Sequence, residues 1–425
     1  SDGGKEITTS TIDPRPFTPL PVGIDVSDSR HGYTELTGQQ VSVWSPSRLQ
    51  EWLRCPRAGW LGRSLRISAE ESQKEDLDAR THGDLFHKIH HNLLLDILEF
   101  EEGTDRNIDF SSETKIPLNI FKSKINPEIL MQRALENLDT IAPWLNRSDA
   151  VSTNRIRMMT GMNLKEWNNW LIAPKPTSLS GRIGRMIEAE LLLENVIPIA
   201  LEWDLSQDNS NGVEISLPKH ITLPKGNTLP SIWLRGMIDR VDLAPFDSEK
   251  NIWINKEGSK DIAPLEIYDS DWKPRRLVII RDLKTTEKTE VEERHYTGVL
   301  EELQLALYAR SWEVAHPGDL VIGVGISVLG HNTSHMVEMS TNALVSDLTA
   351  IGQPTEITHD RFRFLNEDES PNSDPFRAWL ASRISVALNV SDRTSKGYIN
   401  PIPEKYNCKY CRVKDICDVK LEGDF

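Results

Sequence analysis

The chain has 425 residues, of which 38% are hydrophobic and 7% aromatic, so it can bury at least one large core. Its formal net charge of −15 argues against a protein that coats nucleic acid, because phosphate binding depends on lysine and arginine. No run of about 18 apolar residues occurs, so we expect no membrane segment. The polar N-terminus lacks secretory-signal features and an initiator methionine, which suggests a trimmed or excised chain.

Basic residues are concentrated in three runs, at 50–67, 273–288 and 405–414, while acidic residues dominate elsewhere. A solvated face is the ordinary explanation of any one such run. The runs could form a local track for DNA only if folding brings them together.

Residues 1–40 are rich in proline, serine, threonine and glycine, which indicates a flexible arm before a single domain at 41–425. The stretch SPSRLQEWLRCP then predicts a helix, with Ser45 as its cap, Pro46 at the first position and Pro56 after its end.

A second helix is predicted at about 80–99, where Leu85, Ile89 and Leu93 recur at helical spacing. Residues 104–195 are mostly helical in pattern, carry no chemical motif and are interpreted as an insertion. The elements expected after it are strands at 197–205, 232–243 and 275–284, a polar loop at 245–274, a helix at 298–315, a strand at 320–329 and a helix at 373–391. This order predicts an α/β fold.

The stretch RDLKT follows the apolar run 277–280, which is typical of a strand buried on both faces. Asp282 and Lys284 share one face of that strand, because side chains two apart point the same way. Carboxylates that hold Mg²⁺ or Mn²⁺ beside a lysine suit phosphodiester hydrolysis. A triplet this short also arises by chance as an ordinary surface pair.

A second carboxylate is available on the preceding strand, in the stretch GMIDRVDL. Asp239 is the first candidate, and Gly236 before it could relieve crowding. Asp242 competes, but it falls on the opposite face of the strand. Either residue could instead be a simple charge at a strand end.

Five short stretches, SPSRLQEWLRCP, HGDLFHKIHH, GMIDRVD, IIRDLKT and QLALYA, occur in this order. Together they resemble the PD-(D/E)XK nuclease superfamily, in the branch of RecB-like and AddB-like nuclease domains. The resemblance spans about 45–417 and implies a restriction-endonuclease-like core, with a central mixed sheet flanked by helices, the helical insertion and a cluster-binding tail at 400–425.

The resemblance also implies residue roles. The metal ligands would be His87, Asp239 and Asp282, with Lys284 as the catalytic lysine and Gln304 and Tyr308 lining the site from the next helix. Gln304 and Tyr308 are four apart, so both can point inward from one helix face. One departure from the family pattern is the polar segment of about 30 residues between Asp239 and Asp282, where relatives often have a short hairpin.

Other histidines surround His87, at positions 82, 90 and 91. His87 and His91 have the spacing of a zinc pair on one helix face, although no H-E-x-x-H arrangement accompanies them. A lone helical histidine is usually structural, and the interpretation of His87 as a ligand depends on the two carboxylates and the lysine.

Four cysteines in a chain of this length do not make a secreted disulfide scaffold, so a reducing cytoplasm is expected. Cys408, Cys411 and Cys417 form C-x2-C-x5-C, and Cys55 stands far earlier. Four thiolates suit either Zn²⁺ or an iron–sulfur cluster. The layout resembles the [4Fe–4S] staple of AddB-like nucleases, which would clasp the two ends of the domain.

The resemblance implies a metal-dependent DNA nuclease, exonuclease-like, that processes DNA ends in recombination or repair. It also implies an association with a helicase or another subunit of a DNA-processing complex. No Walker A motif is present, so any ATP-driven motor would lie on another chain. The alternative is a non-catalytic DNA-binding or scaffolding subunit that keeps the fold and the cluster.

Overall fold

The computed structural model describes residues 43–67, 79–97, 108–109, 126–147, 149–191, 197–216, 229–243, 276–285, 298–299, 301–317, 319–329, 334–340 and 375–417. The expected arm at 1–40 and the polar loop at 245–274 lie outside the described residues. None of the described helices has the length and apolar character that a membrane crossing requires.

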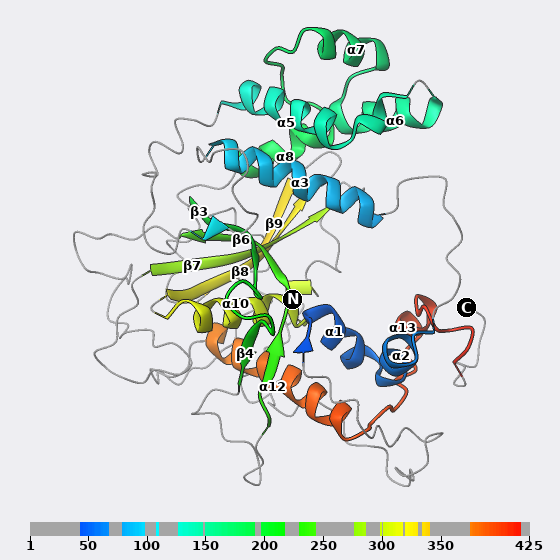
Figure 1. Cartoon of the computed structure of the whole chain (residues 1–425), viewed down its shortest axis with the longest axis vertical. Coiled ribbons are helices and arrows are strands. Elements are labelled where there is room, and N and C mark those ends of the chain that lie inside the picture. The colour runs from blue at the N-terminus through cyan, green and yellow to red at the C-terminus, as the bar shows by residue number, and fades with distance from the viewer. Residues whose placement is uncertain are drawn as a thin grey trace, which may run out of the picture.

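A six-stranded sheet forms the centre of the molecule (Figure 1). Its strands, in spatial order, are β2 (Ile108–Asp109), β3 (Ile197–Asp204), β6 (Met237–Leu243), β7 (Arg276–Thr285), β8 (Asp319–Leu329) and β9 (Ser334–Ser340). Strands β7 and β8 are parallel, and the other neighbours are antiparallel. The expected mixed sheet is therefore confirmed.

Helices cover both faces of this sheet, as Figure 1 shows. Helices α3 (Ala79–Ile97) and α8 (Gly181–Leu191) lie on one face, and α10 (Gln304–Ala315) and α12 (Pro375–Ser395) lie on the other. The apolar residues 278–280 of β7 are accordingly buried although they alternate between faces. Helix α10 connects β7 to its parallel neighbour β8, as parallel pairing requires.

A second, three-stranded sheet has the order β1 (Val43–Trp44), β5 (Ile232–Leu234) and β4 (Val213–Ile215). The expectation of one strand over 232–243 is wrong, because β5 and β6 belong to different sheets. Arg235 and Gly236 separate them, and the Arg235 N–H donates to the Trp44 carbonyl at 2.8 Å. The break falls at Gly236, a residue that weakens a strand, but strand-forming residues flank it on both sides.

The N-terminal helices follow the capping chemistry of the sequence. Helix α1 (Pro46–Arg54) begins after Ser45, whose hydroxyl accepts from the Arg48 N–H at 3.3 Å. Pro56 ends α1 as expected and also opens α2 (Pro56–Gly59), which a π-helical turn continues over Trp60–Ser64.

The remaining helices are α5 (Pro127–Ile141), a 3₁₀ turn at Pro143–Asn146, α6 (Ala150–Thr160), α7 (Leu164–Ile172) and the short α13 (Lys405–Lys409). Helices α5 to α7 lie beyond α3 and α8, on the side away from the sheet (Figure 1). The mostly helical pattern expected within 104–195 is thus found in its described part. Residues 298–299 are helical as expected, but helix α10 itself begins at Gln304, after a short non-helical segment at 301–303.

Candidate active site and cysteine clasp

Two carboxylates face each other across β6 and β7. In the register of the two strands, Arg240 lies opposite Arg281 and Val241 lies opposite Ile280. Asp239 precedes Arg240 and Asp282 follows Arg281, so the two aspartates are neighbours on one face of the sheet. The Leu283 N–H donates to Asp239 Oδ2 at 2.8 Å, which ties the two strands directly beside the carboxylates.

Asp282 is held by two other expected site residues. Its side chain is 4% exposed, and its Oδ2 lies 2.5 Å from Lys284 Nζ. Gln304, the first residue of α10, donates from Nε2 to Asp282 Oδ1 at 2.8 Å. The sheet and the helix after it therefore converge on one carboxylate.

Tyr308 lies one turn further along α10 and is buried against Gly236. A Cβ added at Gly236 would lie 3.1 Å from both the Tyr308 ring and its hydroxyl, so glycine permits this close approach. The expected relief of crowding at Gly236 is borne out by that contact. Burial, followed by the charges of Asp239 and Asp282, raises the pKa of Tyr308 and keeps the phenol protonated.

His87 approaches Asp239 from α3. Its Nε2 lies 3.0 Å from the Leu283 carbonyl, and its Nδ1 lies 3.8 Å from Asp239 Oδ1. The structure thus brings His87 close to Asp239, even though α3 and α10 approach the sheet from opposite faces.

The electrostatics of this cluster are dominated by two neighbouring acids. Burial and the charge of Asp282 raise the pKa of Asp239 to about 7, although His87 opposes the shift. Burial disfavours the charged form of Lys284, but Asp282 and Asp239 outweigh it and raise the pKa of the amine. Two carboxylates against one lysine leave an excess of negative charge, which a divalent cation would neutralise.

The donor set of His87, Asp239 and Asp282 therefore fits the chemistry of Mg²⁺ or Mn²⁺. Within the part of the chain that the structure describes, however, no three His, Cys, Asp or Glu side chains form a ready metal-binding group. Both oxygens of Asp282, one oxygen of Asp239 and one ring nitrogen of His87 are instead engaged by Lys284, by Gln304 or by the Leu283 backbone. The spacing of His87 and His91 likewise gains no third ligand for zinc among the described residues.

A small cavity of about 20 Å³ adjoins these residues. Its lining includes the site residues His87, Asp239 and Asp282, together with Glu190 and Arg240. This volume is enough for about one water molecule. The Oε1 atom of Glu190 and the Nη2 atom of Arg240 have no hydrogen-bond partner among the described residues, so a water there would have polar neighbours.

The four cysteines line one much larger cavity, of about 1070 Å³, together with α1 and the tail. All four are free thiols, and the Ile402 N–H contacts Cys55 Sγ at 3.4 Å. Burial raises the pKa of Cys408 and of Cys411, and the thiols of Cys55 and Cys417 add to both shifts. Folding therefore places Cys55, the residue after α1, at the same cavity as the three cysteines of the tail, although no three of these thiols form a ready metal-binding group among the described residues.

Charged contacts fasten α1 to both the tail and the carboxylate site. Glu51 accepts from Arg63 Nε at 2.7 Å and pairs with Arg412 of the tail. Arg54 pairs with Glu302, and the next residue, Leu303, donates its N–H to Gln50 Oε1 at 3.0 Å. The segment before Gln304 is thus attached to α1, the helix that ends directly before Cys55.

The three basic runs do not form a simple surface track for DNA, because some of their residues serve the fold. Runs 50–67 and 405–414 do meet, through Arg63, Glu51 and Arg412. Arg57 is buried and donates to the Ile399 carbonyl at 3.2 Å, so it serves the fold. Arg281 of the third run is also buried, at 1% exposure.

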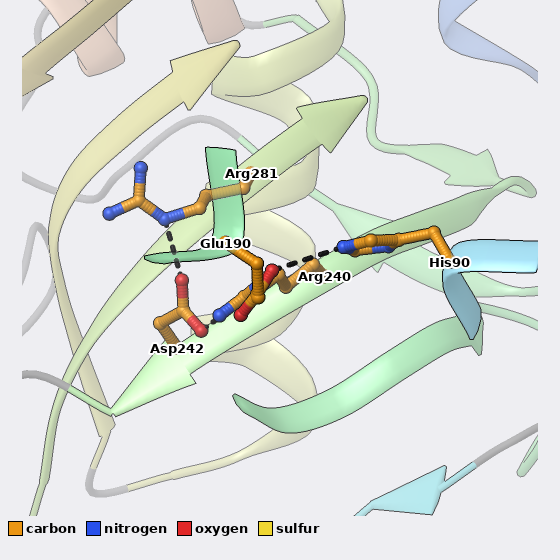
Figure 2. A network of polar contacts seen from close by, with 5 residues as sticks. All are labelled: His90, Glu190, Arg240, Asp242 and Arg281. Carbon is orange, nitrogen blue, oxygen red and sulfur yellow. Dashed lines mark hydrogen bonds and ion pairs between the residues drawn. The ribbon is translucent and has the colours of Figure 1, made fainter. Parts of the chain in front are cut away.

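Asp242, the competing carboxylate, lies on the face opposite Asp239, as expected. It is fully buried and accepts from Arg240 Nε at 2.7 Å and Arg281 Nε at 2.6 Å (Figure 2). This network was not predicted from the sequence. The sequence signal that could have revealed this network is the pair of opposite charges, Arg240 and Asp242, two residues apart on one face of β6.

A comparison with protein families agrees with this geometry. The chain matches the PD-(D/E)XK nuclease superfamily in two stretches, residues 43–268 and 267–418, which together cover most of its length. No match was found among curated proteins. Two carboxylates and a lysine on adjacent central strands, together with this match, show that the chain belongs to the PD-(D/E)XK nuclease superfamily.

Proposed function

We propose that this nuclease is a metal-dependent deoxyribonuclease of the RecB/AddB type that processes DNA ends in recombination or repair. The observation that carries the proposal is the meeting of Asp239, Asp282 and Lys284 on β6 and β7. The excess negative charge there is suited to a divalent cation, and the lysine is suited to a phosphate.

Each side chain has a definite part in this proposal. His87, Asp239 and Asp282 would hold Mg²⁺ or Mn²⁺, which supplies charge neutralisation at the scissile phosphate and a water of lowered pKa. Lys284 remains protonated and donates to a phosphate oxygen or to the attacking water. Gln304 orients Asp282, and the neutral Tyr308 closes the site against solvent.

The four cysteines would hold a [4Fe–4S] cluster, with Zn²⁺ as the alternative. Thiolate is the preferred ligand of both. The cluster would be structural, because it would fasten α1 to the tail at 400–425 beside the contacts of Glu51. Purified protein that is brown and contains iron and sulfide supports this assignment. Colourless protein with stoichiometric zinc contradicts it.

The substrate and partners follow from the resemblance and from the charge distribution. DNA would approach over the joined basic runs, and a helicase or another subunit on a separate chain would supply any motor. The arm at 1–40, the domain at 41–425 and the insertion at 104–195 complete the proposed organisation, in a cytoplasmic protein.

A cleavage assay on end-labelled single- and double-stranded DNA, with Mg²⁺ or Mn²⁺, tests the proposal. Wild-type protein should cleave, and Asp282→Ala should abolish cleavage while DNA binding persists. Asp392→Ala, which removes the ion pair between Asp392 of α12 and Lys396, is a control that should cleave normally. Wild-type protein that binds DNA but cleaves with neither metal would favour a non-catalytic scaffolding subunit instead.

A further inference from the structure

A network of buried charges lies directly behind the carboxylate site. Residues Arg240 and Arg281 each adjoin a site aspartate in sequence, and they point to the opposite face of β6 and β7. Both donate to Asp242, one to each carboxylate oxygen (Figure 2). Asp242 therefore bridges the two strands that carry Asp239 and Asp282.

The network continues into the helices on that face. Arg240 Nη1 lies 2.5 Å from Glu190 Oε2 of α8, and His90 Nε2 of α3 lies 3.1 Å from the same oxygen. Burial alone would raise the pKa of Glu190, but Arg240 and His90 lower it to about 2. The two carboxylates of this network are thus matched by two guanidinium groups.

Side chains on one face of β6 and β7 favour separation of the two strands, and side chains on the other face favour their association. On the site face, Asp239 and Asp282 repel each other, which favours separation of the strands. On the other face, the arginines adjoining them are drawn to Asp242. The attraction of Arg240 and Arg281 to Asp242 therefore opposes the repulsion between the two site aspartates.

We propose that Asp242 is a positioning residue, which clamps β6 to β7 through Arg240 and Arg281 and so holds Asp239 and Asp282 at the separation that a divalent cation needs. The catalytic consequence of this clamp rests on the proposed nuclease function, but the effect on cation binding does not. A merely structural network would change stability and leave the affinity of the folded protein for the cation unchanged.

The test compares Asp242→Asn with Asp319→Asn in the full chain. The Asp242 change keeps the shape but presents an amide N–H to an arginine donor, which opens the clamp. Asp319 is also a buried aspartate on this sheet, accepts from Trp312 Nε1 at 3.0 Å, and lies at the end of β8 that pairs with Arg276, away from Asp282. It is therefore a matched change remote from the site.

Binding of Mn²⁺ alone, measured from the loss of the free-ion electron paramagnetic resonance signal, is the primary readout. We expect the Kd for Mn²⁺ to rise about 10-fold in Asp242→Asn, within the range seen when groups that orient metal ligands are removed. In Asp319→Asn the Kd should change less than about 2-fold. Cleavage by Asp242→Asn should recover at high metal concentration, as a shift in half-saturating metal rather than in kcat.

An unchanged Mn²⁺ Kd in folded Asp242→Asn overturns the positioning role, as does wild-type protein that binds no Mn²⁺. Wild-type protein that binds Mn²⁺ without cleaving DNA removes the proposed function but still tests the clamp through the Kd. If Asp242→Asn does not fold, Arg281→Lys keeps the charge and loses the planar donor geometry, and the same rise in Kd is expected.

Discussion

The two faces of β6 and β7 carry the same kinds of side chain in opposite electrostatic states. On one face, Asp239 and Asp282 share a single lysine, and the pKa of Asp239 is raised to about 7. On the other face, Asp242 and Glu190 are matched by two arginines, and the pKa of Glu190 is lowered to about 2. The strand alternation that separates the two sets is a property of the backbone alone.

This difference in charge balance distinguishes the candidate binding site on one face of β6 and β7 from the structural network on the other face. Balanced buried charges strongly disfavour loss of either partner, because the remaining charge is left uncompensated. Unbalanced charges favour a binding partner of opposite charge. Substitutions that alter the charge on one face at a time can test this difference.

The largest effect is expected on the site face, from Asp282→Asn. The change keeps the shape of the side chain and removes a proposed metal ligand, so cleavage should fall by at least about 10³-fold. The folded state should persist, because repulsion with Asp239 is relieved. Cleavage rates with Mg²⁺ and Mn²⁺, together with circular dichroism, check both expectations, and near-normal cleavage would contradict the assigned role.

The next effect is expected on the opposite face, from Asp242→Ala. Removal of this carboxylate leaves Arg240 and Arg281 buried without their shared counter-charge, and the free energy of unfolding should fall by about 3–5 kcal/mol. Urea denaturation of metal-free protein measures it. A loss below about 1 kcal/mol would show that the network is not the balanced scaffold described above.

A change of opposite sign is expected from Asp239→Asn in metal-free protein. The folded-state pKa of Asp239, about 7, lies above its ordinary value of 3.8, so ionisation destabilises the folded chain. Stability should therefore fall in the wild type as pH rises from about 4 to about 7, by a margin that the variant lacks. At pH 8 we expect the variant to be more stable by about 1–2 kcal/mol.

Urea denaturation in the presence of a chelator, repeated across this pH window, gives the difference between the two proteins. The amide oxygen of the asparagine can still accept from the Leu283 N–H, so the strand contact is preserved. A variant less stable than the wild type at pH 8 would show that contacts with His87 and Lys284 outweigh the repulsion.

The smallest effect is expected from Gly236→Ala. Its Cβ would press on Tyr308 at 3.1 Å, which requires a shift of a few tenths of an ångström at the wall of the site. We expect cleavage to fall about 3- to 10-fold, with a loss of about 1 kcal/mol in stability. Gly62→Ala meets only the flexible end of Arg412 and should cleave normally. Equal effects of the two changes would argue against a role for the Tyr308 contact.

Much of the candidate site was predictable from local pattern. The alternation of β-strand side chains placed Asp282 with Lys284 and separated Asp242 from Asp239, and helical spacing placed Gln304 with Tyr308. The capping residues Ser45 and Pro46 located the start of α1. These features depend on backbone periods of about two and 3.6 residues, which a sequence displays directly.

Other features were beyond local pattern. The run at 232–243 was interpreted as one strand, and although Gly236 could mark a bend, it does not by itself show that β5 and β6 enter different sheets. The basic run at 273–288 suggested a surface track, but Arg281 is buried against Asp242. A charged side chain is buried only when a partner from elsewhere in the chain compensates it, and that partner is invisible to a short window.

By itself, the sequence determined which side chains share a strand face or a helix face, and hence which chemistry each element could offer. Only the tertiary structure decided which elements meet: His87 of α3 with Asp239 of β6, Cys55 with the three cysteines of the tail, and Glu190 with Arg240. The physical reason is that periodicity is a property of the local backbone. Contacts between distant segments depend instead on packing and charge compensation across the whole core.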